Sequence, residues 1–206
     1  MKLTSRALLF SVLGLIIFVF TTTNALAKNK DSASIQDSSH IAVKAKMNAL
    51  LLYHTKTGHT LEAANAIVQG IQSAGGSVTL VLAKEFSPQT INQYNVFIVG
   101  SPCWGGSIAN GISTPVADAM DKITNEVKGK LCAGFAVNSG NGGQSTVKSI
   151  GERLKAKGCG EYVAGPVAKA GAPFSLWVGS AVKPEDRAHY TAFGKDLVDK
   201  FTKQKK

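Results

Sequence analysis

The stretch LLYHTKTGHTLEAANAI, residues 51–67, joins an apolar run to a helical pattern through a loop of threonine, lysine, glycine and histidine. The apolar run predicts a buried strand, and the spacing of alanine and isoleucine after the loop predicts an amphipathic helix. A helix that directly follows a buried strand is typical of the repeating unit of a parallel sheet. The loop holds three threonines around Gly58, which is more hydroxyl groups than the capping of one helix explains.

The rest of the chain repeats this alternation of strand and helix. Five apolar runs predict strands, at residues 48–53, 77–82, 95–100, 131–137 and 161–167. Helical patterns lie at residues 61–74, 108–122, 144–157 and 184–203, with Pro115 as a kink or break in the second. Residues 83–94 are too polar for more than a small helix. The sequence therefore predicts an α/β fold, a doubly wound five-stranded parallel sheet covered on both faces.

The first residues of the chain have the layout of a secretory signal. Lys2 and Arg6 precede residues 7–20, which carry no charge, and small residues follow at Ala25 and Ala27. This layout predicts a signal peptide at residues 1–27 and an exported, periplasmic protein. The alternative is an uncleaved membrane anchor, although the apolar run is shorter than the roughly 20 residues of a usual span. Residues 28–47 read as a flexible spacer, so the folded domain is expected at residues 48–206.

The charge balance indicates the class of partner. The 206 residues contain 23 basic and 13 acidic side chains, for a net charge of +10, which becomes +8 without Lys2 and Arg6. Such an excess favours an acidic protein partner or an anionic membrane surface. Nucleic acid is not expected, because the basic residues are scattered and are not interleaved with aromatic side chains.

The loop after the first predicted strand is a candidate phosphate site. In doubly wound folds, ligands bind outside the carboxyl ends of the strands. The N-terminus of a helix offers unpaired N–H groups and partial positive charge, which suit a phosphate group. Gly58 allows the backbone to turn close to such an anion. The residues expected to bind it are Thr55, Lys56, Thr57, Gly58, His59 and Thr60.

The same stretch resembles the signature of the flavodoxin family. The matching positions after the aliphatic run are Tyr53, Thr55, Gly58, Thr60, Ala64 and Ile67. Two further loops fit in the right order, GSPCWGG at residues 100–106 and NSGNGGQ at residues 138–144. The resemblance covers roughly residues 48–203 and implies FMN as the cofactor and the strand order 2-1-3-4-5. The dinucleotide fingerprint GxGxxG is absent after the first strand, which argues against NAD as a tightly held cofactor.

The resemblance also implies which residues surround the flavin ring. Trp104 is expected to stack on one face, whereas the third loop has no aromatic residue and leaves the other face open to a partner or substrate. Cys103 is either a redox thiol or a small buried side chain. The His59 ring either donates to the phosphate or lies on the surface. The residues implied to cradle the ring are Pro102, Cys103, Trp104, Gly105, Gly106, Asn138, Ser139, Gly140, Gly142 and Gly143.

Two functions fit an FMN protein of this kind. One is an electron carrier between redox protein partners, and the other is an FMN-dependent quinone reductase resembling NAD(P)H:quinone oxidoreductases. The Asn-Gly-Gly-Gln run at residues 141–144 and the open flavin face favour the reductase. The predicted signal peptide favours the carrier, because nicotinamide cofactors are cytoplasmic. We expect electron transfer through FMN, and the protein's part in it is to hold the flavin and tune its potential.

Three cysteines follow the predicted signal peptide, Cys103, Cys132 and Cys159, and none are spaced as CxxC, so a metal site is not indicated. The family's strand order would make the fourth and fifth strands neighbours, with Cys132 and Cys159 at the same end of the sheet. This placement predicts a disulfide between them, and the alternative is a pair of reduced, buried cysteines.

The three candidate loops contain no acidic residue. Asp and Glu are absent from residues 54–61, 100–113 and 138–146. Familiar flavodoxins are acidic, and negative charge near FMN disfavours the anionic reduced flavin. The flavin of this chain is therefore expected to be easier to reduce than that of an acidic flavodoxin.

Overall fold

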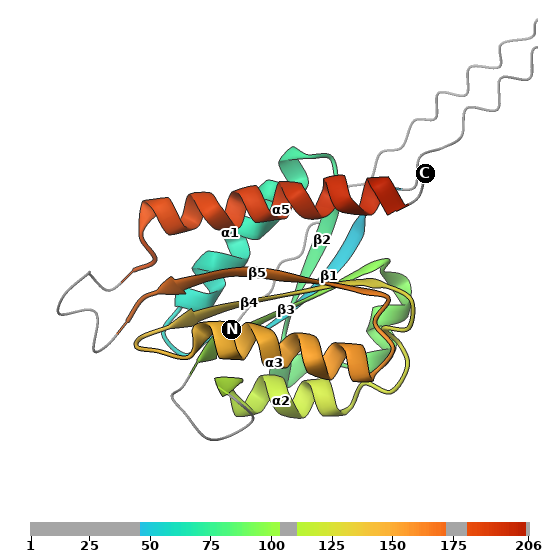
Figure 1. The fold of residues 1–206 in the computed structure, drawn as a ribbon, viewed down its shortest axis with the longest axis horizontal. Coiled ribbons are helices and arrows are strands. Elements are labelled where there is room, and N and C mark those ends of the chain that lie inside the picture. Colours follow the sequence, from blue (N-terminus) through green and yellow to red (C-terminus); the bar gives the residue numbers. More distant parts are fainter. Residues whose placement is uncertain (1–45, 104–110, 172–180, 205–206) are drawn as a thin grey trace, which may run out of the picture. The chain divides into compact units, whose positions relative to one another are not determined.

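The sheet has five parallel strands in the order β2-β1-β3-β4-β5, as predicted (Figure 1). The computed structural model describes residues 46–103, 111–171 and 181–204. The strands are β1 (Asn48–Tyr53), β2 (Ser77–Leu82), β3 (Val96–Cys103), β4 (Leu131–Asn138) and β5 (Glu161–Lys169). All four neighbouring pairs run parallel. Their carboxyl ends therefore meet at one edge of the sheet.

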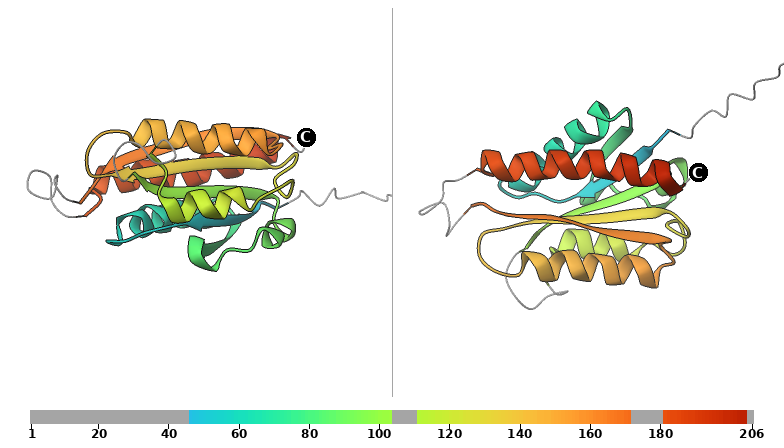
Figure 2. Two further views of the ribbon diagram at one scale, coloured as in Figure 1. Left: turned by 90° about the horizontal axis from the view of Figure 1, so that it is seen from below. Right: turned by 45° about the horizontal axis from the view of Figure 1, so that its top comes forward.

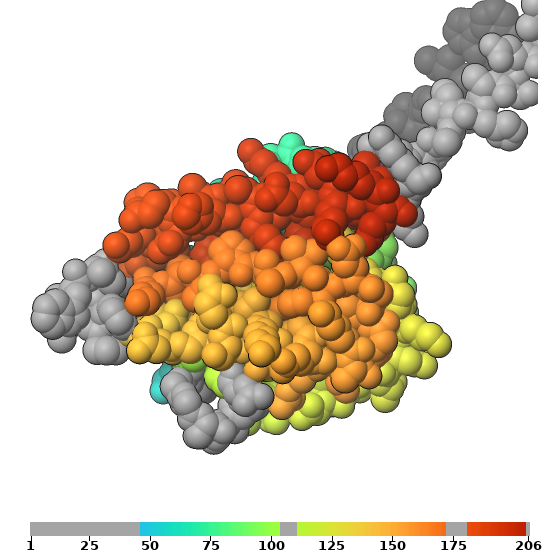
Figure 3. All heavy atoms as spheres, in the orientation of Figure 1, coloured from blue at the N-terminus to red at the C-terminus, as the bar shows by residue number. Residues whose placement is uncertain are grey.

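Helices cover both faces of this sheet. They are α1 (His59–Ser73), α2 (Thr114–Asp121), α3 (Gly143–Ala156) and α5 (Pro184–Gln204), with short 3₁₀ helices η1 (Ala83–Glu85) and η2 (Pro88–Gln93). Helices α1 and α5 lie on one face, and α2 and α3 lie on the other (Figures 1 and 2). Figure 3 shows α5, in red, lying against the orange atoms of β5. This arrangement confirms the doubly wound architecture.

The position of β1 between β2 and β3 explains why the opening apolar run shows no alternation. Leu51 belongs to the core beneath α1 and α5, whereas Leu50 and Leu52 belong to the core beneath α2 and α3. All three side chains are fully buried. A strand covered on both faces has no solvent side, so every position favours an apolar residue. Met47, the last residue of the predicted spacer, is also buried in the core.

The predicted helix at residues 108–122 is wrong at its start. Helix α2 begins only at Thr114, with Pro115 in its first turn. Proline lacks the N–H group that an interior helical position needs, whereas the first turn does not use it. Before the helix, Gly111 has a φ of 87° and Ile112 forms an antiparallel bridge with Cys103. Proline therefore starts this helix and does not kink it.

Strands β3 and β5 extend two or more residues beyond their predicted ends. The sequence Gly-Ser-Pro after residue 99 resembles a turn, yet β3 continues to Cys103 because it pairs with β4 as far as Asn138. Strand β5 likewise reaches Lys169, opposite Asn138 on β4. Pairing with a neighbouring strand outweighs local propensity here. The extensions carry both strands further into the predicted cofactor edge.

Helices α1 and α5 approach each other closely at two glycines. A Cβ atom at Gly70 would lie 2.0 Å from the backbone oxygen of Thr191, and one at Gly194 would lie 2.4 Å from that of Ile67. No side chain fits between the two backbones at these points.

Within the described ranges, no helix is both long enough and apolar enough to cross a membrane. The predicted signal peptide and residues 28–45 of the spacer lie outside those ranges.

Candidate functional site

The loop after β1 folds into an open helix N-terminus. The Gly58 N–H donates to Thr55 Oγ1 at 3.0 Å, and Gly58 takes a φ of 91° as the N-cap of α1. No side chain caps this helix, and its first internal bond runs from the Glu62 N–H to the Gly58 carbonyl at 2.9 Å. The N–H groups of the three residues between them are therefore directed out of the helix end. This is the geometry that an anion requires.

The surroundings of Gly58 leave room for a ligand. A Cβ atom built on this glycine would meet no atom of the described residues within 4 Å. Lys56 and Thr57 beside it are exposed, whereas Thr60 is buried and only 2% exposed. The phosphate of FMN fits this loop, because the backbone turns past open space and presents donors toward it. The hydroxyls of Thr57 and Thr60, together with the helix amides, remain the groups predicted to hold it.

The His59 ring is partly exposed and lies beside Glu62. Its Nδ1 lies 3.7 Å from Glu62 Oε2, and its side chain is 17% exposed. The ring also lies against Gly171, since a Cβ atom there would approach His59 Cδ2 to 3.2 Å. Glu62 Oε2 in turn accepts a hydrogen bond from the Val182 N–H at 3.0 Å. The ring therefore lies between Glu62 and Gly171, while the His59 amide is among those directed out of the helix end.

The third loop builds a second open helix N-terminus at the same edge. Gly142 has a φ of 99° as the N-cap of α3, and no side chain caps this helix. The Gly142 carbonyl accepts from both the backbone N–H and the Oγ1 of Thr146, at 2.9 and 3.0 Å. The amides of Gly143 and its successors are left available. Two of the three predicted cofactor loops thus present backbone donors at the carboxyl edge.

Asn138 is the buried polar residue of this edge. It is only 3% exposed, and its Nδ2 donates to the Gly140 carbonyl. Its Oδ1 is buried and accepts no hydrogen bond from the residues that the structure describes. A Cβ atom at Gly143 would lie 2.9 Å from that oxygen and 2.2 Å from Val167. Only glycine therefore fits at residue 143, and the oxygen of Asn138 is an acceptor that a ligand donor could satisfy.

Cys103 is a small buried side chain, which is the second of the two predicted roles. It is 5% exposed, and its thiol donates to the Asn141 carbonyl at 3.6 Å. Its sulfur also lies against Gly111 and Gly142. The thiol joins the second loop to the third and does not open toward a ligand. Pro102 beside it, like Ser139 and Gly140 of the third loop, is half-buried, while Trp104, Gly105 and Gly106 lie outside the described residues.

Sequence reasoning missed three residues at this edge. Ser101 and Ser113 are buried, and the Ser113 N–H donates to Ser101 Oγ at 2.9 Å, which fixes the end of β3 to the start of α2. Lys169 is exposed at the end of β5, opposite Asn138. No motif marks the two serines. Lys169 was missed because the predicted strand ended two residues too early.

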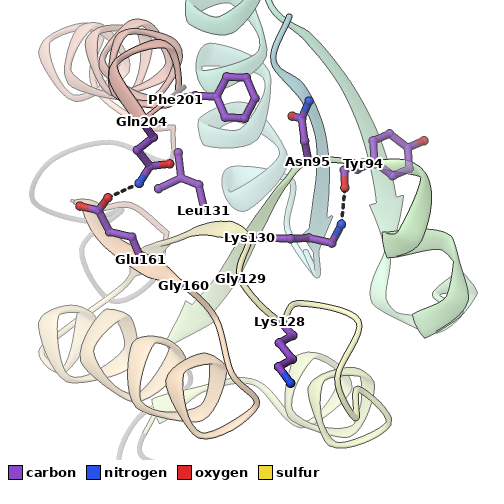
Figure 4. A pocket seen from close by; sticks show the side chains of 10 residues that line it. All are labelled: Tyr94, Asn95, Lys128, Gly129, Lys130, Leu131, Gly160, Glu161, Phe201 and Gln204. Carbon is purple, nitrogen blue, oxygen red and sulfur yellow. Dashed lines mark hydrogen bonds between the residues drawn. The ribbon is translucent and has the colours of Figure 1, made fainter. Parts of the chain in front are cut away.

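A separate hollow lies at the opposite edge of the sheet (Figure 4). It measures about 630 Å³, and its lining includes Leu131 and Glu161, which begin β4 and β5. Lys130 Nζ reaches across it to the Tyr94 carbonyl at 2.6 Å, as the dashed line in Figure 4 shows. The amino ends of the strands are not where doubly wound folds bind their ligands. This hollow is therefore distinct from the cofactor edge.

Comparison with known proteins identifies the family. The family model described as Flavodoxin matches residues 51–169. A flavodoxin from Aquifex aeolicus (strain VF5) is 26% identical over 140 residues, which cover 68% of this chain and 76% of that protein. A solved flavodoxin from the domain Archaea has a TM-score of 0.60 at 19% identity and covers 75% of this chain and 99% of its own. Two-electron reduced Megasphaera elsdenii flavodoxin has a TM-score of 0.59 at 17% identity, over 73% and 98% of the two chains.

The match spans β1 to β5 and includes the three loops of the carboxyl edge, where two helix N-termini stand open. The chain therefore belongs to the flavodoxin family and is an FMN-binding electron-transfer protein.

Proposed function

We propose that this protein is an exported electron carrier that works between redox proteins outside the cytoplasm. The proposal of export is based on residues 1–27, which have the layout of a secretory signal. The site supports the carrier role, because it offers backbone donors and a buried amide for the flavin. In the described part of the site, His59 is engaged with Glu62 and the Cys103 thiol is buried. Neither is placed to move a proton on a bound substrate.

The partner proposed for this carrier is an acidic redox protein. The chain without its first 27 residues has a net charge of +8, and the three cofactor loops carry no acid. Lys56 and Lys169 are both exposed at the carboxyl edge. A positive field around the cofactor edge would steer an acidic partner toward the flavin. An anionic membrane surface would be attracted by the same charge.

A quinone reductase is the second candidate. The observation in its favour is the third loop, residues 138–144, which contains no aromatic residue and in which Asn141 and Gly142 are exposed. Steady-state assays with NADH or NADPH and a soluble quinone separate the two functions. The carrier should show no turnover above that of free FMN, yet its chemically reduced form should pass electrons to an acidic protein acceptor. Sustained nicotinamide-dependent quinone reduction would establish the reductase.

Export has a direct test. The full chain is produced in a bacterium with a periplasm, and the cell fractions are separated. We expect the mature chain in the periplasm with Lys28 as its first residue, because small residues at Ala25 and Ala27 suit signal peptidase. Ala27→Arg should block cleavage and keep the uncleaved chain with the membrane. Wild-type chain retained in the membrane with Met1 present would favour the anchor, and uncleaved chain in the cytoplasm would contradict export.

The absence of acidic residues from the three cofactor loops should appear in the reduction potential of the flavin. We expect the second electron to enter at a less negative potential than in an acidic flavodoxin, because no carboxylate of the three loops opposes the anionic flavin. Gln144→Glu adds a charge to the first turn of α3 and should lower that potential. Gln72→Glu adds the same charge in the last turn of α1, at the other end of the sheet, and should not. Potentiometric titration measures both.

A potential as negative as that of acidic flavodoxins would contradict this expectation. Equal shifts of the reduction potential in the two variants would also contradict it, because the net charge of the protein and not the charge near the flavin would then control the potential.

A further inference from the structure

The fold brings two of the cysteines together at the edge of the sheet remote from the cofactor. Cys132 is the second residue of β4 and is fully buried, whereas Cys159 lies in the turn before β5 and is partly exposed. Both carry free thiols, and Cys159 packs against the buried cluster that contains Cys132. The Cys132 thiol donates to the Lys130 carbonyl at 3.9 Å, and the Cys159 thiol donates to the Glu161 carbonyl at 3.2 Å. The structure thus confirms that they are neighbours but does not contain the predicted disulfide.

The backbone around Cys159 is held in place. The Cys159 N–H donates to the Leu154 carbonyl at 3.1 Å, and the Gly160 N–H donates to the Lys130 carbonyl at 2.9 Å. Residue Lys128 forms an antiparallel bridge with Cys159. The turn therefore fixes the Cys159 backbone beside the segment that leads into β4, independently of any covalent bond. Lys128 and Gly160 also line the hollow in Figure 4, so this turn is at the protein surface.

The two thiols are chemically unequal. The hydrogen bond with the Cys132 side chain, helped by backbone hydrogen bonds with Cys132 and Glu161 and by the charge of Lys155, holds the pKa of Cys159 below its ordinary value. The hydrogen bond with Cys159 and burial raise the pKa of Cys132. The thiolate is the nucleophile in thiol chemistry, and it must also be reachable. Cys159 meets both conditions and Cys132 meets neither.

We propose that Cys132 and Cys159 form a dithiol–disulfide exchange site, with Cys159 as the attacking sulfur and Cys132 as the resolving sulfur. The oxidant is a disulfide, either small or carried by a protein. The Cys159 thiolate attacks one sulfur of that disulfide, forms a mixed disulfide and releases one thiolate. Cys132 then gives up its proton and attacks the Cys159 sulfur, which releases the second thiolate. The chain loses two electrons and two protons, and the oxidant becomes two thiols.

The bond would close the segment from residue 132 to residue 159. That segment contains α3 and the third cofactor loop, including Asn138 and Gly143. A disulfide at its base would fix β4 to the entry of β5 without touching the flavin edge. The site therefore adds a covalent two-electron couple to a protein whose own cofactor lies at the other end of the sheet.

The test uses the full chain with FMN bound, equilibrated in glutathione buffers from fully reduced to fully oxidised. Unreacted thiols are alkylated after unfolding, and the digested chain is mapped by mass spectrometry. We expect a Cys132–Cys159 cross-link in oxidising buffer, with the mass of two hydrogens lost and Cys103 alkylated throughout. Cys103→Ser should keep the cross-link, and Cys132→Ser and Cys159→Ser should each abolish it. Alkylation of both cysteines in wild type at the oxidising limit would overturn the proposal.

The order of attack has its own measurement, the rate at which an aromatic disulfide reagent modifies the folded, reduced protein. Cys132→Ser should keep a fast-reacting thiol, whereas Cys159→Ser should lose it, a difference of at least tenfold. Equal rates in the two variants would overturn the assignment of Cys159. The flavin absorbance of each variant reports whether it has folded. The mapping of the cross-link in the wild-type protein does not depend on the variants.

Discussion

Replacing Thr57 and Thr60 together with alanine is expected to weaken FMN binding by about 10²- to 10⁴-fold. Each hydroxyl that bonds to a charged phosphate contributes roughly 1.5–3 kcal/mol, and the sum is roughly 3–6 kcal/mol if the two losses add. Thr57 is exposed beside the open helix end, and Thr60 lies in the first turn of α1. Quenching of flavin fluorescence on titration with FMN measures the dissociation constant.

The controls separate binding from folding. Thr202→Ala removes a hydroxyl from α5 at the other end of the sheet and should leave the affinity unchanged. Thr57→Ala alone removes an exposed hydroxyl. It should therefore cause about half of the double variant's loss in the free energy of FMN binding, without lowering the melting temperature of the apoprotein. Wild-type affinity in the double variant would remove these two threonines from the phosphate site and leave only the backbone amides.

Replacing Gly70 with alanine should destabilise the fold by about 1–2 kcal/mol. The new Cβ atom would lie 2.0 Å from the Thr191 carbonyl oxygen, so α1 and α5 must move apart. Overpacking of a tight core costs roughly 1–3 kcal/mol or more, and the better helix propensity of alanine returns only about 1 kcal/mol. Denaturant unfolding of the apoprotein, followed by circular dichroism, measures the loss.

A substitution on the same helix provides the comparison. Asn65 is exposed on α1, and Asn65→Ala should leave the free energy of unfolding unchanged or raise it slightly. If Gly70→Ala proved as stable as wild type, the helices would have room to separate, and the close contact would not be a requirement of the fold.

The sequence predicted the sheet well because its strands are covered on both faces. Leu50, Leu51 and Leu52 form a run that only a doubly buried strand explains, and the strand at residues 77–82 has the predicted bounds. The start of α2 was wrong because apolar spacing was followed through Gly111 and Pro115, two residues whose backbone requirements decide where a helix can begin. Periodicity finds a helix, but local backbone chemistry sets its ends.

The candidate site was predictable in its loops and not in its side-chain directions. Gly58 and Gly142 mark the two helix starts, and the structure gives both positive φ values. The His59 ring could not be placed from sequence, because Gly171, which lies against it, comes from a distant segment after β5. The close approach at Gly70 was invisible for the same reason, since a small residue in a helix has no pattern of its own.

The two uncapped helix starts have a consequence for proton linkage. Donors made of main-chain amides do not titrate, and the partial charge of a helix end is fixed by the fold. The electrostatic field on an anion held in this way does not change with pH. An anion held by histidine differs, because the charge of the imidazole changes with pH. The affinity of the site for the phosphate should then depend on pH only through the second ionisation of the phosphate itself, near pH 6. A cofactor bound through backbone donors at α1 would stay in place across compartments of different acidity.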